Sequence, residues 1–179
     1  MKITGKLPGR QQTLQVFAVI SILLYGWTTY RFIQKLPSWL YYLNAGEILS
    51  NYSFTLVLNL LEALLFMSFV VILGFLLPRK FFMERFVAHG SLLAIFSLGY
   101  LIYLASAIGQ SKSSQFPSEL FRWTPWVFLI ILLLSIVLPF LKPVQRIADG
   151  FADRAVVFLY ILLPLSGFGI LIFLLNNLA

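Results

Sequence analysis

One long apolar run of this sequence contains three polar side chains that could do chemistry. The run covers residues 54–77, and Glu62 is the one acidic residue deep inside any such run. Thr55, Asn59 and Glu62 follow one another at steps of four and three residues, so a helix presents all three on one side. Because an ionisable group is costly in hydrocarbon, Glu62 is expected to face protein or water rather than lipid.

The first role that suits this polar face is the binding of a proton or a cation. A buried carboxyl group favours its neutral form, which can donate a hydrogen bond to a nearby polar side chain. Tyr100 and Tyr103 of the third apolar run are expected at about the same membrane depth as Glu62. Ser166 of the last run is expected at that depth too. The predicted intramembrane polar site consists of Thr55, Asn59, Glu62, Tyr100 and Tyr103.

The second role is a polar contact between helices, without any transported species. Arg31, near the end of the first apolar run, could reach Glu62 in such a contact. A proton pathway needs a chain of polar groups across the membrane, whereas the residues between Glu62 and Gly74 are mostly apolar. The sequence therefore favours the contact over the pathway.

The motifs that catalysis needs are incomplete. The run DGFADR at residues 149–154 resembles the start of the Asp-Gly-x-x-Ala-Arg motif of CDP-alcohol phosphatidyltransferases, whose further aspartates hold metal ions. No acidic residue follows Asp153, and the chain has no cysteine and one histidine, His89, expected at the membrane interface. We predict no catalytic residues, no metal site and no enzymatic activity, and the sequence indicates no particular cofactor.

The composition is typical of a membrane protein. Hydrophobic residues make up 60% of the 179 residues and charged residues 11%, whereas about a quarter of a soluble domain is charged. The formal net charge is +7, but the basic residues lie between the apolar runs. We therefore expect membrane lipids as partners and no nucleic acid.

Five apolar runs are long enough to be spans, since a helix needs about 20 residues to cross a bilayer. They cover residues 14–33, 54–77, 87–108, 125–141 and 155–175. The predicted fold is an all-α bundle of five transmembrane helices, forming a single transmembrane domain over residues 1–179. The linkers 34–53 and 142–154 are predicted to form short interfacial helices, the first opened by Pro37 and stopped by Gly46.

The third apolar run carries a stripe of small residues that predicts close helix packing. Small side chains let helix backbones approach one another in lipid, so this helix is expected at the centre of the bundle. At helical spacing, with Leu101 among them, the predicted packing residues are Gly90, Ala94, Ser97, Ala105 and Gly109.

The distribution of Lys and Arg predicts the orientation. The segment before the first run and the second and fourth linkers hold nine of these residues, and the other two linkers hold four. Basic residues are enriched on the cytoplasmic side, so the N-terminus is expected in the cytoplasm and the C-terminus outside. The expected location is the plasma (inner) membrane, as a multi-pass protein.

These features suggest two functions of different classes. The first is a non-catalytic integral membrane subunit that packs in or scaffolds a larger membrane protein complex, because the chain is small and has few buried polar groups. The alternative is a small proton-linked carrier or lipid-handling protein that uses Glu62. The sequence favours the first.

Overall fold

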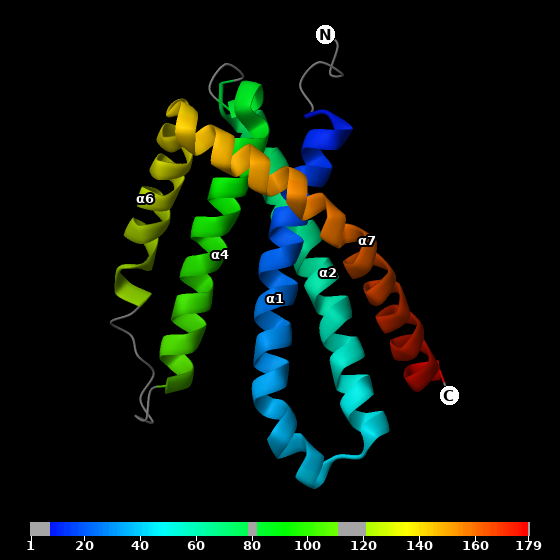
Figure 1. Ribbon diagram of the computed structural model, residues 1–179. Coiled ribbons are helices and arrows are strands. Elements are labelled where there is room, and N and C mark those ends of the chain that lie inside the picture. Colours follow the sequence, from blue (N-terminus) through cyan, green and yellow to red (C-terminus); the bar gives the residue numbers. More distant parts are fainter. Residues whose placement is uncertain (1–7, 79–81, 111–120, 179) are drawn as a thin grey trace.

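The computed structural model describes residues 8–78, 82–110 and 121–178, and these residues form helices and no strand (Figure 1). The predicted all-α fold is confirmed. The long helices are α1 (Arg10–Tyr42), α2 (Ala45–Leu76), α4 (Phe86–Gln110) and α7 (Lys142–Leu178), and the shorter ones are α6 (Thr124–Val137) and the 3-10 turns η2 (Met83–Arg85) and η3 (Leu138–Phe140).

Four helical segments are long and apolar enough to cross a membrane. They are Arg10–Tyr42, Ala45–Leu76, Met83–Gly109 and Lys142–Leu175. The predicted span 125–141 corresponds to a shorter apolar helix, Thr124–Phe140. The chain therefore has the helices of a multi-pass membrane protein, but the structure does not confirm the count of five spans.

The predicted interfacial helix in the linker 34–53 is wrong. α1 continues through Pro37, and α2 begins directly after Asn44, with Gly46 inside its first turn. Asn44 Oδ1 accepts a hydrogen bond from the Glu47 backbone N–H at 2.9 Å, and a Glu47 carboxylate oxygen accepts one from the Asn44 N–H at 2.8 Å. This reciprocal cap satisfies two donors at the start of α2, so the helix starts nine residues before the predicted span.

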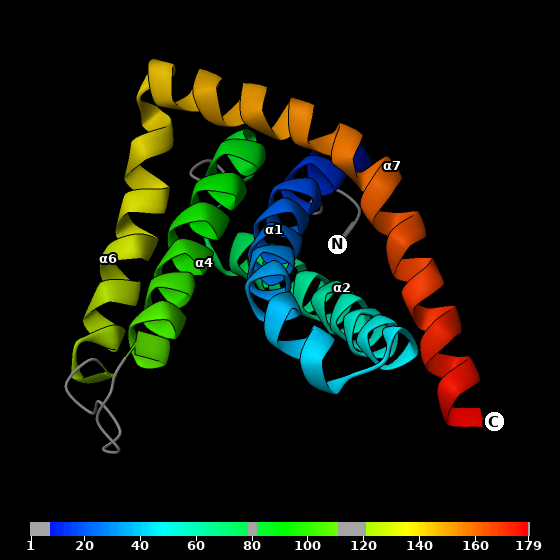
Figure 2. The ribbon, with the colours of Figure 1, turned by 60° about the horizontal axis from the view of Figure 1, so that its bottom comes forward.

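The linker 142–154 is helical, but it is the first part of α7 and not a separate short helix. In Figure 2 this amber part of α7 lies across the ends of α4 and α1, and the helix then changes direction toward its red end. No helix break separates the crossing part from the predicted span 155–175. α7 therefore contacts α1, α2 and α4.

α1 is the central helix, in place of the predicted third span. It packs against α2, α4 and α7, and Figure 2 shows it between α4 and α7. The helix is buried on all sides over residues 16–21, and Val16, Ala18, Val19 and Ile20 of this stretch pack into one hydrophobic core with residues of α2, α4 and α7. α1 carries these aliphatic residues in one short stretch, so it can contact several neighbours at once.

Gly169 brings α7 close to α2, and we predict that its replacement destabilises the bundle. A Cβ at this position would lie 3.1 Å from the Ser53 carbonyl oxygen and 3.2 Å from Leu56 Cβ. Gly169→Ala should lower the free energy of unfolding by about 1–3 kcal/mol, the usual cost of overpacking. Denaturation of the purified protein by sodium dodecyl sulfate measures this change.

Gly167→Ala is the matched control, because no atom lies within 4 Å of a Cβ built there. It should leave stability unchanged or raise it by up to about 1 kcal/mol, since alanine favours a helix over glycine. Equal changes in the two variants would contradict a stabilising role for the close contact between Gly169 and α2.

Candidate functional site

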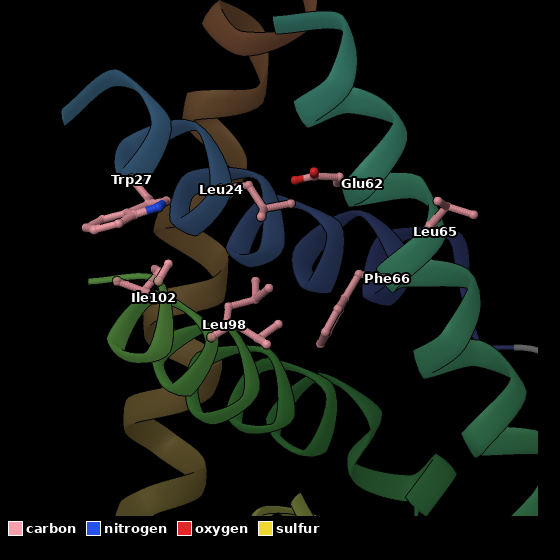
Figure 3. Close-up of a pocket in the computed structure, with 9 residues that line it drawn as sticks. Leu24, Trp27, Glu62, Leu65, Phe66, Leu98 and Ile102 are labelled. Atoms are coloured by element: carbon pink, nitrogen blue, oxygen red, sulfur yellow. The ribbon is translucent and has the colours of Figure 1, made fainter. Parts of the chain in front are cut away.

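A groove of about 490 Å³ opens on the side of the bundle between α1, α2 and α4 (Figure 3). Apolar side chains form most of its wall, and Glu62 supplies the only charge among the lining residues. In Figure 3 the Glu62 carboxylate points from α2 toward Leu24 of α1. The apolar wall includes Leu24 and Trp27 of α1, Leu65 and Phe66 of α2, and Ile102 and Ala105 of α4.

The groove exists because α4 packs tightly on α1 at one end and leaves it at the other. A Cβ on Gly90 would lie 2.9 Å from both terminal carbons of Val16, and Ala94 and Ser97 are buried. Ala105 and Gly109, further along the same stripe, are exposed. Figure 1 shows the lower parts of α1 and α4 apart. The small residues of α4 therefore support packing in one half and an open groove in the other.

The Glu62 carboxylate is exposed and has no hydrogen bond or ion pair within the part of the chain that the structure describes. Arg31, the partner considered from the sequence, places its guanidinium carbon 5.6 Å from the centre of the Trp27 ring. That distance allows a cation–π interaction between Arg31 and Trp27. Glu62 thus carries a charge in an apolar groove with no counter-charge bonded to it.

Asn59 and Thr55 make contacts separate from the groove. Asn59 is buried, and its Oδ1 accepts a hydrogen bond from the Thr28 hydroxyl of α1 at 2.9 Å. Thr55 donates to the Asn51 carbonyl of its own helix at 2.7 Å. Three residues turn a helix by about 300°, so Asn59 and Glu62 point about 60° apart. Asn59 therefore faces α1 while Glu62 faces the groove.

Tyr100 and Tyr103 lie on the side of α4 that faces α6 or is exposed, and neither lines the groove. The Tyr100 hydroxyl lies 3.1 Å from the Thr124 hydroxyl, and its ring meets Phe128 edge-on at 5.6 Å. Tyr103 is 59% exposed. The structure thus leaves Glu62 alone among the five residues of the predicted polar site.

A buried polar cluster that sequence reasoning missed joins α1, α2 and α7. The Tyr25 hydroxyl lies 2.5 Å from Ser166 Oγ and donates to the Leu56 carbonyl oxygen at 3.3 Å. Ser166 was expected near Glu62, but it contacts Tyr25 instead. The signal in the sequence was the polar set Tyr25, Thr28 and Thr29 inside the first apolar run. This cluster holds helices together and lies apart from the groove residues.

Tyr25→Phe should therefore weaken the bundle without changing the groove. Loss of the hydroxyl removes the hydrogen bonds to Ser166 and to the Leu56 carbonyl, at a cost of about 1–2 kcal/mol in the free energy of unfolding. Tyr160→Phe, at a side chain that is 78% exposed, is the control and should have no effect. Detergent unfolding of both variants is the measurement, and an unchanged Tyr25→Phe midpoint would contradict a structural role for the cluster.

His89 and the acidic residues of α7 are also occupied by structural contacts. His89 is buried: its Nδ1 lies 2.7 Å from the Ser135 carbonyl oxygen, and its ring stacks on Phe82 at 5.1 Å. Asp153 accepts a hydrogen bond from the Gln15 side chain at 2.5 Å. Within residues 8–78, 82–110 and 121–178, no group of three or more acidic or histidine side chains could hold a metal ion.

The chain shows no similarity to known proteins that would assign a function to this groove. No family model matches it, and neither a curated protein nor a solved structure matches it.

Proposed function

We propose that this chain is a non-catalytic integral membrane subunit that packs in a larger membrane protein complex through the groove beside Glu62. The observation that carries the proposal is the exposed Glu62 carboxylate, without a bonded counter-charge, in an apolar groove open to the side of the bundle. A charge in this position is costly in hydrocarbon. A partner protein that fills the groove and pairs with the carboxylate removes that cost.

The proposed topology has five spans, with the N-terminus in the cytoplasm and the C-terminus outside the plasma (inner) membrane. α6 with η3 extends for roughly 25 Å, close to the thickness of a bilayer core of about 30 Å. Figure 1 shows α6 beside α4, with α1 beginning and α7 ending at opposite ends of the bundle. Five of the thirteen basic residues that support this orientation lie outside the described residues, namely Lys2, Lys6, Arg79, Lys80 and Lys112.

The second candidate is a small proton-linked carrier or lipid-handling protein. The observation that favours it is the open groove itself, which could receive a lipid chain or a small ligand beside Glu62. The other titratable or hydroxyl groups selected from the sequence, Tyr100, Tyr103 and Ser166, do not line the groove. Because a relay needs several polar groups in sequence, the subunit is the better supported function.

Purification of the full chain in a mild detergent distinguishes the two functions. The tagged protein is solubilised from the membranes of the organism that makes it, and proteins retained with it are quantified by mass spectrometry. A stoichiometric membrane protein partner is the expected result. A protein that purifies alone, and that shows pH-dependent transport in vesicles lost on Glu62→Gln, would identify a carrier instead.

A further inference from the structure

We infer that the groove beside Glu62 binds a transmembrane helix of a different protein, and that this helix carries a lysine or arginine near the middle of the bilayer. The inference rests on the proposed function and names the chemistry of the partner. It follows from the charge of the groove, from the depth of Glu62, and from the positions of the basic residues in this chain.

The negative charge of Glu62 favours a cationic occupant of the groove. Glu62 is the only charged group among the residues that line the groove, and it has no hydrogen bond or ion pair with any described residue. A lysine or arginine in a lone transmembrane helix carries a similar cost in hydrocarbon. Pairing of the two charges offsets both costs and gives the contact its specificity.

The depth of Glu62 favours a helix over a lipid headgroup. Glu62 lies eight residues, or about 12 Å, into the predicted span 54–77, and it is close to the middle of the 32-residue helix α2. Half of a typical core is about 15 Å thick, so the carboxylate lies near the middle of the membrane. A lipid amine would have to leave its headgroup layer to reach this depth, whereas a side chain on a crossing helix is already there.

The walls of the groove suit a helix with a long basic side chain. Phe66 offers a flat apolar surface along which the methylene stem of a lysine or arginine can lie, whereas Arg31 of this chain lies over the Trp27 ring. Ala105 is an exposed small residue of α4 that lines the groove, where another helix backbone can approach closely. The groove thus combines an apolar wall, one carboxylate and a small-residue edge.

A second copy of this chain does not provide the required cation. None of its thirteen basic residues lies in the middle of a predicted span. Arg31 comes nearest, but it is two residues, or about 3 Å, from the end of the predicted span 14–33. It also interacts with Trp27 of its own helix. The partner is therefore a different protein.

The absence of cysteine allows a direct test with synthetic peptides. Ala105→Cys places a thiol in the groove, and Leu129→Cys places one on α6 outside it. Each protein is reconstituted in phosphatidylcholine vesicles with a leucine–alanine helix of about 22 residues that has one cysteine and a central lysine. A peptide with leucine in the central position is the reference, and the measured quantity is the disulfide yield at equilibrium.

The lysine peptide should couple to A105C at least about tenfold more than the leucine peptide, a difference of about 1.4 kcal/mol. Glu62→Gln should abolish this preference, and L129C should show none. Glu62→Lys should reverse it and favour a peptide with a central glutamate. A reversed preference can be observed only if the Glu62→Lys protein is folded. It therefore shows the role of the charge even if the Glu62→Gln protein does not fold.

Equal coupling of the lysine and leucine peptides to A105C would overturn the inference, as would a lysine preference that survives Glu62→Gln. Competition by phosphatidylethanolamine that removes the preference would also overturn it, because a lipid amine would then be the occupant. If the peptides show no preference while a native partner still purifies with the protein, this inference fails and the proposed function stands. If the preference is found but no partner purifies, the proposed function fails alone.

Discussion

Glu62→Leu should make the isolated protein more stable and should at the same time remove it from its complex. In the isolated chain the substitution replaces an unpaired carboxylate in an apolar groove by a side chain that suits hydrocarbon. An acidic residue at the centre of a membrane helix costs about 2.5–3.5 kcal/mol on insertion scales, and we expect a gain of about 1–3 kcal/mol in the free energy of unfolding. Detergent unfolding and partner co-purification are measured on the same preparation.

Two further variants separate charge from packing in this experiment. Glu62→Gln removes the charge but keeps the polar shape, so it should also lose the partner while gaining less stability than Glu62→Leu. Leu61→Ala changes the adjacent side chain, which does not line the groove, and should retain the partner. A loss of stability in Glu62→Leu would show that the carboxylate has a partner inside its own chain, for which Arg31 is the candidate.

The second large effect is expected at Gly90, where α4 lies close to side chains of α1 and α2. A Cβ there would lie 2.9 Å from both terminal carbons of Val16 and 3.3 Å from a terminal carbon of Val70. Valine side chains are stiff and both of these are fully buried, so they have little room to move. Gly90→Ala should lower the free energy of unfolding by about 1–3 kcal/mol, and Gly90→Val should lower it further and reduce the folded yield.

Gly99→Ala is the matched control on the same helix, since a Cβ there would have no atom within 4 Å. It should be neutral or stabilising by up to about 1 kcal/mol. Size-exclusion chromatography gives the folded yield, and detergent unfolding gives the stability. If Gly90→Ala matched Gly99→Ala, the tight contact between α4 and α1 would not be a determinant of stability.

The all-α membrane character of the chain could be predicted from the sequence because it depends on hydropathy and length alone. The continuity of the helices could not. Pro37 and Gly46 usually mark helix ends, but α1 passes through the first and α2 through the second. The pair Asn44 and Glu47, at the spacing of an N-terminal cap, was the local signal for where α2 begins.

The candidate site could be predicted only in part because periodicity does not fix how a helix is rotated toward its neighbours. The spacing of Asn59 and Glu62 placed them on one side of α2, but Asn59 contacts α1 and Glu62 lines the groove. Tyr100 and Tyr103 were predicted to join this site, but neither lines the groove, and Tyr100 contacts Thr124 of α6 instead. These differences depend on packing between helices that are distant in sequence.

The most direct test of the role of the groove is photo-crosslinking in native membranes. A photoreactive amino acid replaces Leu65, which lines the groove and is 71% exposed, or Leu129 on α6, which is 50% exposed. We predict that the Leu65 position forms an adduct with one membrane protein, that Glu62→Gln abolishes this adduct, and that the Leu129 position does not form it. Adducts with lipid alone at Leu65, or the same protein adducts at both positions, would contradict the proposal that the groove receives a partner.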